Sequence, residues 1–207
     1  MILSHNGVTV KIETNYVLRG TVYPTETREL SDMAYNTFKR FVAVQTLSVA
    51  DLYGSKLCAA LDRQHPRDFY DVKILLDETG ISQNILQAFL VYLISHPRPI
   101  NELLNPNFKD INHIFANEFE GMTREKISLH KLVNTQHVLP GMVLKMLSNS
   151  DREFLMSFKQ MQPKWDLLGI SGVQDMPAVQ WKLRNLSRMT KKKHEQAATK
   201  LKICLHA

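Results

Sequence analysis

Apolar and polar residues alternate strictly over residues 7–15, near the start of the chain. The apolar side chains Val8, Val10 and Ile12 share one face of an extended segment, and polar side chains occupy the other. A period of two residues indicates a half-buried β-strand. A second β-rich run follows over residues 38–47, and the polar, irregular residues between the two runs are expected to form a loop.

From residue 48 onward, the spacing of apolar residues becomes that of helices. Ser48 followed by Asp51 is a typical helix start. This helix is expected to end at His65-Pro66, because proline disfavours helix in the residue before it. The next helix is expected from about Asp68 to Glu78, with a glycine just beyond its end.

Further helices are expected along the rest of the chain. They fall after Ser82, over residues 110–119, from Thr123 to Leu147 with a break near Pro140-Gly141, from a capping box at Ser150–Glu153, from Pro177 and from Thr190. A small β-containing part that leads into a larger helical part is the order of an α+β protein. A boundary near residue 80 gives two domains, 1–80 and a helical domain 81–207 that ends in a basic tail.

Composition indicates a soluble globular protein, with 44% hydrophobic and 22% charged residues. No apolar run approaches the roughly 20 residues that a membrane span needs. The first residues lack the basic and apolar regions of a signal peptide, and the two cysteines are far apart in sequence. A reduced, cytoplasmic setting is expected, without a membrane partner.

The net charge of +6 is concentrated near the C-terminus. The segment from Lys182 to Lys202 contains eight basic residues and one acid, a net charge of +7, whereas the rest of the chain carries about −1. Such a segment attracts polyanions, so Lys191, Lys192 and Lys193 are candidate nucleic-acid contacts. The alternative is an ordinary solvated helix face.

The stretch from Lys56 to Asp71 gathers basic and acidic side chains around a proline. Lys56 and Arg63 are seven residues apart and share a helix face, as do Asp68 and Asp71, which are three apart. A cationic surface opposite two carboxylates suits phosphate and metal chemistry. In the alternative interpretation, Asp68 is a helix N-cap, Asp71 is its capping partner, and the arginines form surface ion pairs.

The motif Lys56-Leu-x-Ala-x-x-x-Arg63-x-x-x-Arg67-Asp68-x-Tyr70-Asp71 resembles that of the AbiEii/AbiGii family of nucleotidyltransferase toxins. Three later stretches resemble the C-terminal helical region of the family: Ser150-Asp-Arg-Glu-Phe-Leu, Pro163-Lys-Trp165 and Pro177-Ala-Val-Gln-Trp181-Lys-Leu-x-Asn185-Leu186. The resemblance implies a remnant of a polymerase-β-like nucleotidyltransferase core followed by helices. It also implies a toxin of bacterial toxin–antitoxin and phage-defence systems, with an antitoxin as partner.

The resemblance further implies transfer of a nucleotide from an NTP to an acceptor, which is RNA (tRNA 3′ ends in some members) or protein, with Mg²⁺ as cofactor. Lys56 would contact the NTP phosphates, supported by Arg63 and Arg67. Asp71, together with Asp68, would complete the catalytic site. Glu13 lies where such folds carry a metal-binding carboxylate, although an outward-facing strand residue is the alternative for it.

One family motif has no counterpart in this sequence. Nucleotidyltransferases of this type begin with a Gly-Ser turn followed by Asp-x-Asp on a strand, and these carboxylates hold the divalent ions. Gly54-Ser55 is a false match, because it lies inside the helix that carries Lys56. The chain is therefore expected to be a truncated remnant, to have a mis-assigned start, or to receive the metal-binding pair from a second chain.

Two other functions compete with nucleotidyl transfer. A catalytically inactive remnant would bind nucleotide, RNA or a cognate antitoxin through Lys56, Arg63, Arg67 and the basic tail. A metal-independent nuclease would use His65 and His137 as its available bases. A partial N-terminal sheet would also expose strand edges, from which a homodimer is expected.

Overall fold

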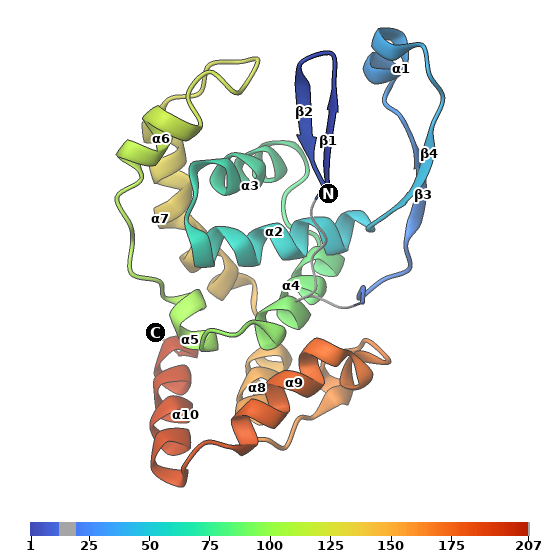
Figure 1. Cartoon of the computed structure of the whole chain (residues 1–207). Coiled ribbons are helices and arrows are strands. Elements are labelled where there is room, and N and C mark those ends of the chain that lie inside the picture. Colours follow the sequence, from blue (N-terminus) through green and yellow to red (C-terminus); the bar gives the residue numbers. More distant parts are fainter. Residues whose placement is uncertain (13–19, 207) are drawn as a thin grey trace.

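The computed structural model of the chain describes residues 1–12 and 20–206, and within them ten α-helices form most of the molecule (Figure 1). The helices are α1 (Asp32–Phe38), α2 (Val49–Arg63), α3 (Pro66–Glu78), α4 (Gln83–Ser95), α5 (Ile100–Leu104), α6 (Asn112–Glu118), α7 (Leu129–Met146), α8 (Asn149–Lys159), α9 (Pro177–Ser187) and α10 (Lys191–Leu205). Four short strands precede α2, so the expected α+β class is confirmed.

The strands form two separate antiparallel pairs. β1 (Ile2–His5) pairs with β2 (Val8–Lys11), and β3 (Glu26–Glu29) pairs with β4 (Ala43–Thr46). The expected half-buried strand is wrong in its burial, because Val8 is 64% and Val10 53% exposed. The alternation is real, but the hairpin has no partner layer in the part of the chain that the structure describes.

The polar segment between the two β-rich runs is more ordered than the sequence indicates. It contains β3 and the short helix α1, which begins where the Ser31 hydroxyl accepts a hydrogen bond from the Ala34 N–H at 3.4 Å. Both elements are short and contain no buried residue, so they carry no apolar periodicity to detect. Residues 13–19, including Glu13, lie outside the described residues.

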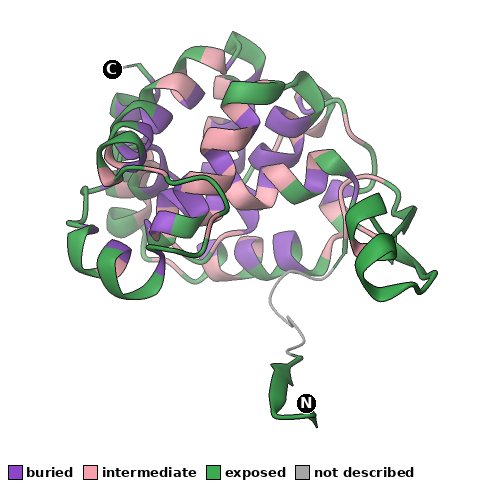
Figure 2. Ribbon diagram, turned by 90° about the horizontal axis from the view of Figure 1, so that it is seen from above, coloured by how far each residue is buried: buried purple, intermediate pink, exposed green. Residues whose placement is uncertain are grey.

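The hydrophobic core lies within the helices that follow β4. Buried residues concentrate at the centre of this helical body, whereas β1, β2 and the region around α1 are exposed (Figure 2). A single cluster of buried side chains runs from Leu57 to Leu205 and includes Leu61, Phe89 and Phe154. Because this core includes residues on both sides of residue 80, the division into domains 1–80 and 81–207 stays a prediction.

Two expected helix boundaries are wrong. α7 begins after Ser128, because the Thr123 hydroxyl donates to the Glu125 carbonyl in a local turn and caps nothing. The capping box of α8 is formed by Ser148 and Asp151, two residues before the expected Ser150–Glu153 box. The starts of α2 at Ser48, α4 at Ser82, α9 at Pro177 and α10 at Thr190 agree with the sequence.

The expected break at Pro140 is also absent. α7 continues through this proline, since Leu139 and Val143 beside it are fully buried. A proline inside a helix removes one backbone hydrogen bond, and tertiary packing can outweigh that loss.

Candidate functional site

The motif that runs from Lys56 to Asp71 forms an antiparallel helix pair, α2 and α3, joined by a tight turn. Gln64 ends α2 in the left-handed conformation, with φ of +56°. His65 is the N-cap of α3, and its Nδ1 accepts a hydrogen bond from the Arg67 N–H at 3.1 Å. Asp68 is therefore not the N-cap, because Pro66 already occupies the first turn of α3. This result excludes the capping interpretation of the two aspartates.

A buried amide network fixes this turn. The Gln64 Oε1 accepts hydrogen bonds from the Lys109 N–H at 3.0 Å and from the Gln136 Nε2 at 2.8 Å. The Gln64 Nε2 donates to the Asn107 carbonyl at 2.9 Å. α7 and the segment before α6 thus hold the end of α2, and this constraint sets the register between α2 and α3.

The register brings Lys56 and Asp71 together. The Lys56 ammonium forms an ion pair with Asp71 Oδ2, and the two side chains are 30% and 27% exposed. Lys56 also points away from the core, because Leu57 and Leu61 on the other face of α2 are buried. The expected juxtaposition of Lys56 with Asp71 is present in the structure as a partly exposed pair.

A second ion pair, between Arg63 and Asp68, lies two turns from Lys56 along α2 and one turn from Asp71 along α3. Arg63 Nη2 is 2.6 Å from Asp68 Oδ1, and the arginine side chain is 58% exposed while that of the aspartate is 6% exposed. The other carboxylate oxygen, Asp68 Oδ2, is buried and has no hydrogen-bond partner among the residues described. A buried acceptor without a partner is rare in folded proteins, and a bound water, an ion or a catalytic role commonly accounts for one.

Arg67 differs from the other two cations. It is exposed at the start of α3, and its side chain has no ion-pair partner in the described ranges. Lys56, Arg63 and Arg67 together outnumber the two aspartates by one charge. The α2–α3 surface, defined by these five residues, therefore offers a net positive, partly exposed cluster that suits phosphate oxygens.

The carboxylates of this surface do not fit a divalent metal site. Asp68 and Asp71 each bind a cationic side chain, and no group of three histidine, cysteine, aspartate or glutamate residues with metal-binding spacing occurs in the described ranges. Glu13, the expected metal ligand, is outside those ranges. Its role stays a prediction.

Gly54 has a structural role that explains why Gly54-Ser55 is a false motif match. A Cβ atom at Gly54 would lie 2.7 Å from the Phe89 backbone nitrogen. The glycine therefore permits the close crossing of α2 and α4, and no phosphate-binding turn is present at this position.

The two histidines that the sequence offered as bases have structural contacts. His65 caps α3 through Nδ1, and its Nε2 lies 3.3 Å from Glu118 Oε2. The His137 ring packs edge-on against Phe108 at a centroid distance of 4.4 Å. They lie on the α2–α3 turn and on α7, and no hydrogen bond or ring contact joins the two rings within the described residues.

The basic tail begins with three exposed lysines. Lys191, Lys192 and Lys193 form the first turn of α10. In contrast, Lys182, at the start of the basic segment, is buried, and its ammonium donates to the carbonyl oxygens of His96, Pro97 and Arg98 at 2.5, 3.1 and 2.9 Å. Burial lowers the pKa of Lys182 from 10.5 to about 8. This lysine stabilises the segment that follows α4 and does not contribute to the basic surface.

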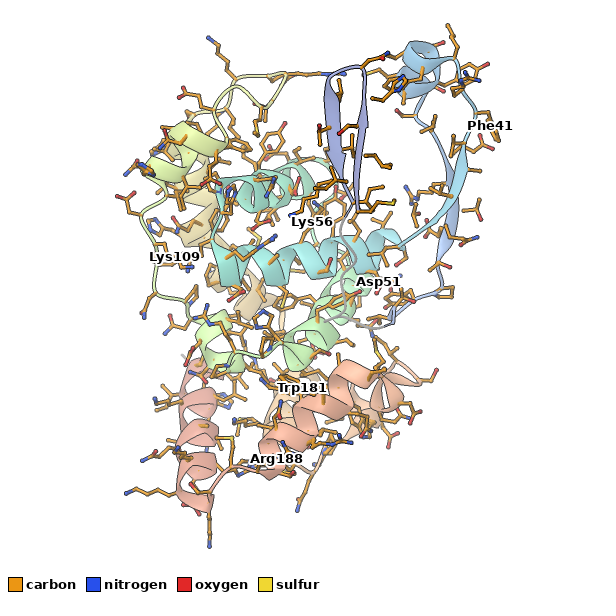
Figure 3. All side chains as sticks on the ribbon, in the orientation of Figure 1. Phe41, Asp51, Lys56, Lys109, Trp181 and Arg188 are labelled. Atoms are coloured by element: carbon orange, nitrogen blue, oxygen red, sulfur yellow. The ribbon has the colours of Figure 1, made fainter. Side chains whose placement is uncertain are left out.

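Asp51 is a buried polar centre that sequence reasoning identified only as a capping residue. Its carboxylate accepts hydrogen bonds from the Val22 and Tyr23 N–H groups, the Ser48 hydroxyl and the Tyr92 hydroxyl, at 2.8, 3.0, 2.8 and 2.7 Å. Burial and the hydrogen bond to Asp51 raise the pKa of Tyr92. Four donors on a fully buried carboxylate join the segment before β3 to α2 and α4. Figure 3 marks the place of Asp51 on α2.

The α+β architecture is consistent with a nucleotidyltransferase-like protein. The chain belongs to the AbiEii family, nucleotidyl transferase toxins of type IV toxin–antitoxin systems, whose family model matches residues 3–185. Comparison with curated proteins and with solved structures gave no match. No helix in the described residues is long and apolar enough to cross a membrane. The matched range contains the whole α2–α3 surface and ends before α10.

Proposed function

We propose that the α2–α3 surface binds the phosphates of a nucleoside triphosphate and serves nucleotidyl transfer to an RNA acceptor. The observation that supports this proposal is the half-buried Lys56–Asp71 pair beside the unpartnered Asp68 Oδ2. Membership of a nucleotidyl transferase toxin family makes this chemistry the first to test.

Each residue of the surface has a distinct part in this proposal. The Lys56 ammonium stabilises negative charge on the triphosphate, and Asp71 holds that ammonium in place on the side facing α3. The exposed Arg63 and Arg67 guanidinium groups bind further phosphate oxygens, a role that suits their planar donors. Transfer joins an acceptor oxygen to the α-phosphorus and releases pyrophosphate.

Incubation of the chain with radiolabelled NTPs, Mg²⁺ and total RNA tests this function. Lys56→Ala and Asp71→Asn should each lower label transfer by about 100-fold or more, as expected for groups that act on the transferred phosphate. Lys73→Ala is the matched control, because Lys73 shares α3 with Asp71 and its one ion-pair partner in the described residues is Asp77 on the same helix, at 2.6 Å. Transfer that is unchanged in Lys56→Ala would contradict the proposal.

Binding without transfer would favour the second candidate, a non-catalytic protein that holds nucleotide or RNA. The observation behind it is that Asp68 and Asp71 are already neutralised by Arg63 and Lys56. Equilibrium binding of a labelled NTP distinguishes the candidates, because binding lost in Lys56→Ala with no transfer in the wild type supports this second function.

The toxin family also suggests an antitoxin partner for this chain. Co-expression with the product of a neighbouring small gene, followed by size-exclusion chromatography with light scattering, tests this interaction. The same measurement on the chain alone tests the homodimer expected from the exposed strands β1–β4.

A further inference from the structure

We infer that α9 and the start of α10 form a binding surface for single-stranded RNA, in which an exposed tryptophan stacks on a base. The α9–α10 band consists of Trp181, Arg184, Arg188, Lys191, Lys192 and Lys193. This inference names the surface that would hold the RNA acceptor of the proposed function. Its binding test does not require transfer, so the two proposals can fail separately.

The face of α9 that carries the band is set by the helix period. Trp181, Arg184 and Arg188 are spaced by three and four residues and therefore lie along one face. The opposite face is buried and includes Val179 and Leu186. The band thus points to solvent on an otherwise well-packed helix.

Trp181 is the unusual member of this face. Its side chain is 51% exposed, and it makes no ring–ring contact within the described part of the chain. The other tryptophan, Trp165, is partly buried and packs on Phe154 and Phe158 at centroid distances of 5.8 and 6.1 Å. An exposed indole one helical turn before an arginine is a stacking surface for an unpaired base, since every base has a flat apolar face.

The basic residues of the band extend from α9 into the first turn of α10. Only residues 188–190 separate the end of α9 from Lys191, so Arg188 and the three lysines lie within about 10–15 Å along the chain. The segment that contains them carries a net charge of +7 over residues 182–202, of which only Lys182 is withdrawn into the interior. A polyanion is the complementary partner.

The aromatic residue distinguishes RNA from an acidic protein as the partner. Carboxylates of an acidic protein would satisfy the arginines and lysines but would leave the indole face without a planar partner. Unpaired nucleotides supply phosphates and flat rings together, whereas duplex bases are already stacked. The combination therefore favours single-stranded RNA.

The band is remote from Lys56. α4 packs against α2 on one side and α9 on another, and Figure 3 shows Trp181 and Arg188 on the far side of α4 from Lys56. Two helix–helix spacings place the axes of α2 and α9 up to about 20 Å apart. The band would hold the body of an RNA, while a different part of that RNA reaches the α2–α3 surface.

Fluorescence anisotropy with a labelled, unstructured single-stranded RNA of about 15 nucleotides tests the inference. Trp181→Ala should weaken binding by about five-fold or more, the loss expected for one stacked base. Phe41→Ala is the matched control, because Phe41 is an aromatic residue that is 67% exposed and lies near β3 and β4, away from Trp181 (Figure 3). Lys73→Ala, which removes a cation of α3 outside the band, should bind this RNA as the wild type does.

Salt dependence tests the charged part of the band. Replacement of Lys191, Lys192 and Lys193 by glutamine should reduce the slope of log K against log salt concentration by about 2, because each phosphate contact contributes about 0.7. In a Trp165→Phe variant, in which Trp181 is the remaining tryptophan, RNA should quench the fluorescence.

Two results would overturn the inference. One is unchanged RNA affinity in both the Trp181→Ala and the triple-lysine variants, with circular dichroism showing that both are folded. The other is equal affinity for poly-glutamate and for the RNA, with no effect of Trp181→Ala, which would assign the band to an acidic protein.

Discussion

Arg63 binds one oxygen of the Asp68 carboxylate, with Nη2 and Oδ1 2.6 Å apart, and the other oxygen has no partner in the described structure. The two partners differ in environment, since the Asp68 side chain is 6% exposed and that of Arg63 is 58% exposed. Loss of Arg63 and loss of Asp68 should therefore affect the stability of the fold to different extents. This asymmetry separates a structural role for the pair from a ligand-binding role.

Arg63→Met should destabilise the fold more than Asp68→Leu does. The arginine variant leaves a buried carboxylate without its cation, which costs about 2–3 kcal/mol. The leucine variant leaves a solvated guanidinium and removes a buried oxygen that had no partner, so the free energy of unfolding should change by less than about 1 kcal/mol. Urea unfolding of both variants measures this difference.

Asp68→Leu should at the same time strengthen NTP binding, because it removes a negative charge from the α2–α3 surface and frees the Arg63 guanidinium for phosphate oxygens. NTP binding by the variant, measured by isothermal titration calorimetry, checks this expectation. A large loss of stability with unchanged NTP affinity would show that Asp68 is structural only.

Gly54→Ala should destabilise the protein by about 2 kcal/mol or more, despite the better helix propensity of alanine. The new Cβ would meet the Phe89 nitrogen at 2.7 Å and the Ala88 Cβ at 2.8 Å, and neither atom is at the end of a flexible side chain. Gly141→Ala is the control, because Gly141 is in α7 with no neighbouring atom within 4 Å of the new methyl group.

The control substitution should stabilise the protein by up to about 1 kcal/mol, the usual gain for alanine over glycine inside a helix. Thermal unfolding of the two variants therefore gives shifts of opposite sign. Shifts of the same sign would show that the α2–α4 crossing is looser than the structure indicates.

The helices and the charged face of α2 could be predicted because their signals are local. Ser48 caps α2, and the seven-residue spacing of Lys56 and Arg63 fixes their shared face. The pairing of Lys56 with Asp71 needed one further fact, that α2 and α3 fold back on each other at a proline turn. These relationships depend on residues within one short stretch.

The buried polar contacts could not be predicted from the sequence, because they join residues that are far apart in the chain. The hydrogen bond from the Tyr92 hydroxyl to Asp51 joins residues 41 positions apart, and Lys182 binds carbonyls more than 80 positions away. The sequence around Asp51 and Lys182 does not show which distant groups these side chains bind. The alternation of Val8 and Val10 predicted a buried face, but both side chains are exposed. Periodicity shows which side chains share a face but not whether another layer covers that face.

Asp51→Asn should destabilise the protein by about 3 kcal/mol or more. The carboxylate accepts four hydrogen bonds while fully buried, and an amide nitrogen in place of one oxygen would face donors that it cannot accept. Tyr92→Phe removes only one donor and should cost about 1–2 kcal/mol. Equal losses of unfolding free energy in Asp51→Asn and Tyr92→Phe, measured by urea unfolding, would contradict the role of Asp51 as acceptor of all four hydrogen bonds.

Lys182 should make the stability of the fold depend on pH in the alkaline range. Burial lowers its pKa to about 8 in the folded protein, from 10.5. Between these two pH values the unfolded chain binds the extra proton, so the free energy of unfolding rises with pH, by up to about 1.4 kcal/mol per unit. In Lys182→Met this contribution is absent, and the free energy of unfolding of the wild type relative to that of the variant should therefore grow from pH 8 to pH 10.

Lys200→Met is the control for this prediction. It removes an exposed lysine of α10 and should keep the pH profile of the wild type in urea unfolding. Parallel profiles for the wild type and Lys182→Met would show that the three carbonyl acceptors fully compensate the burial of the ammonium.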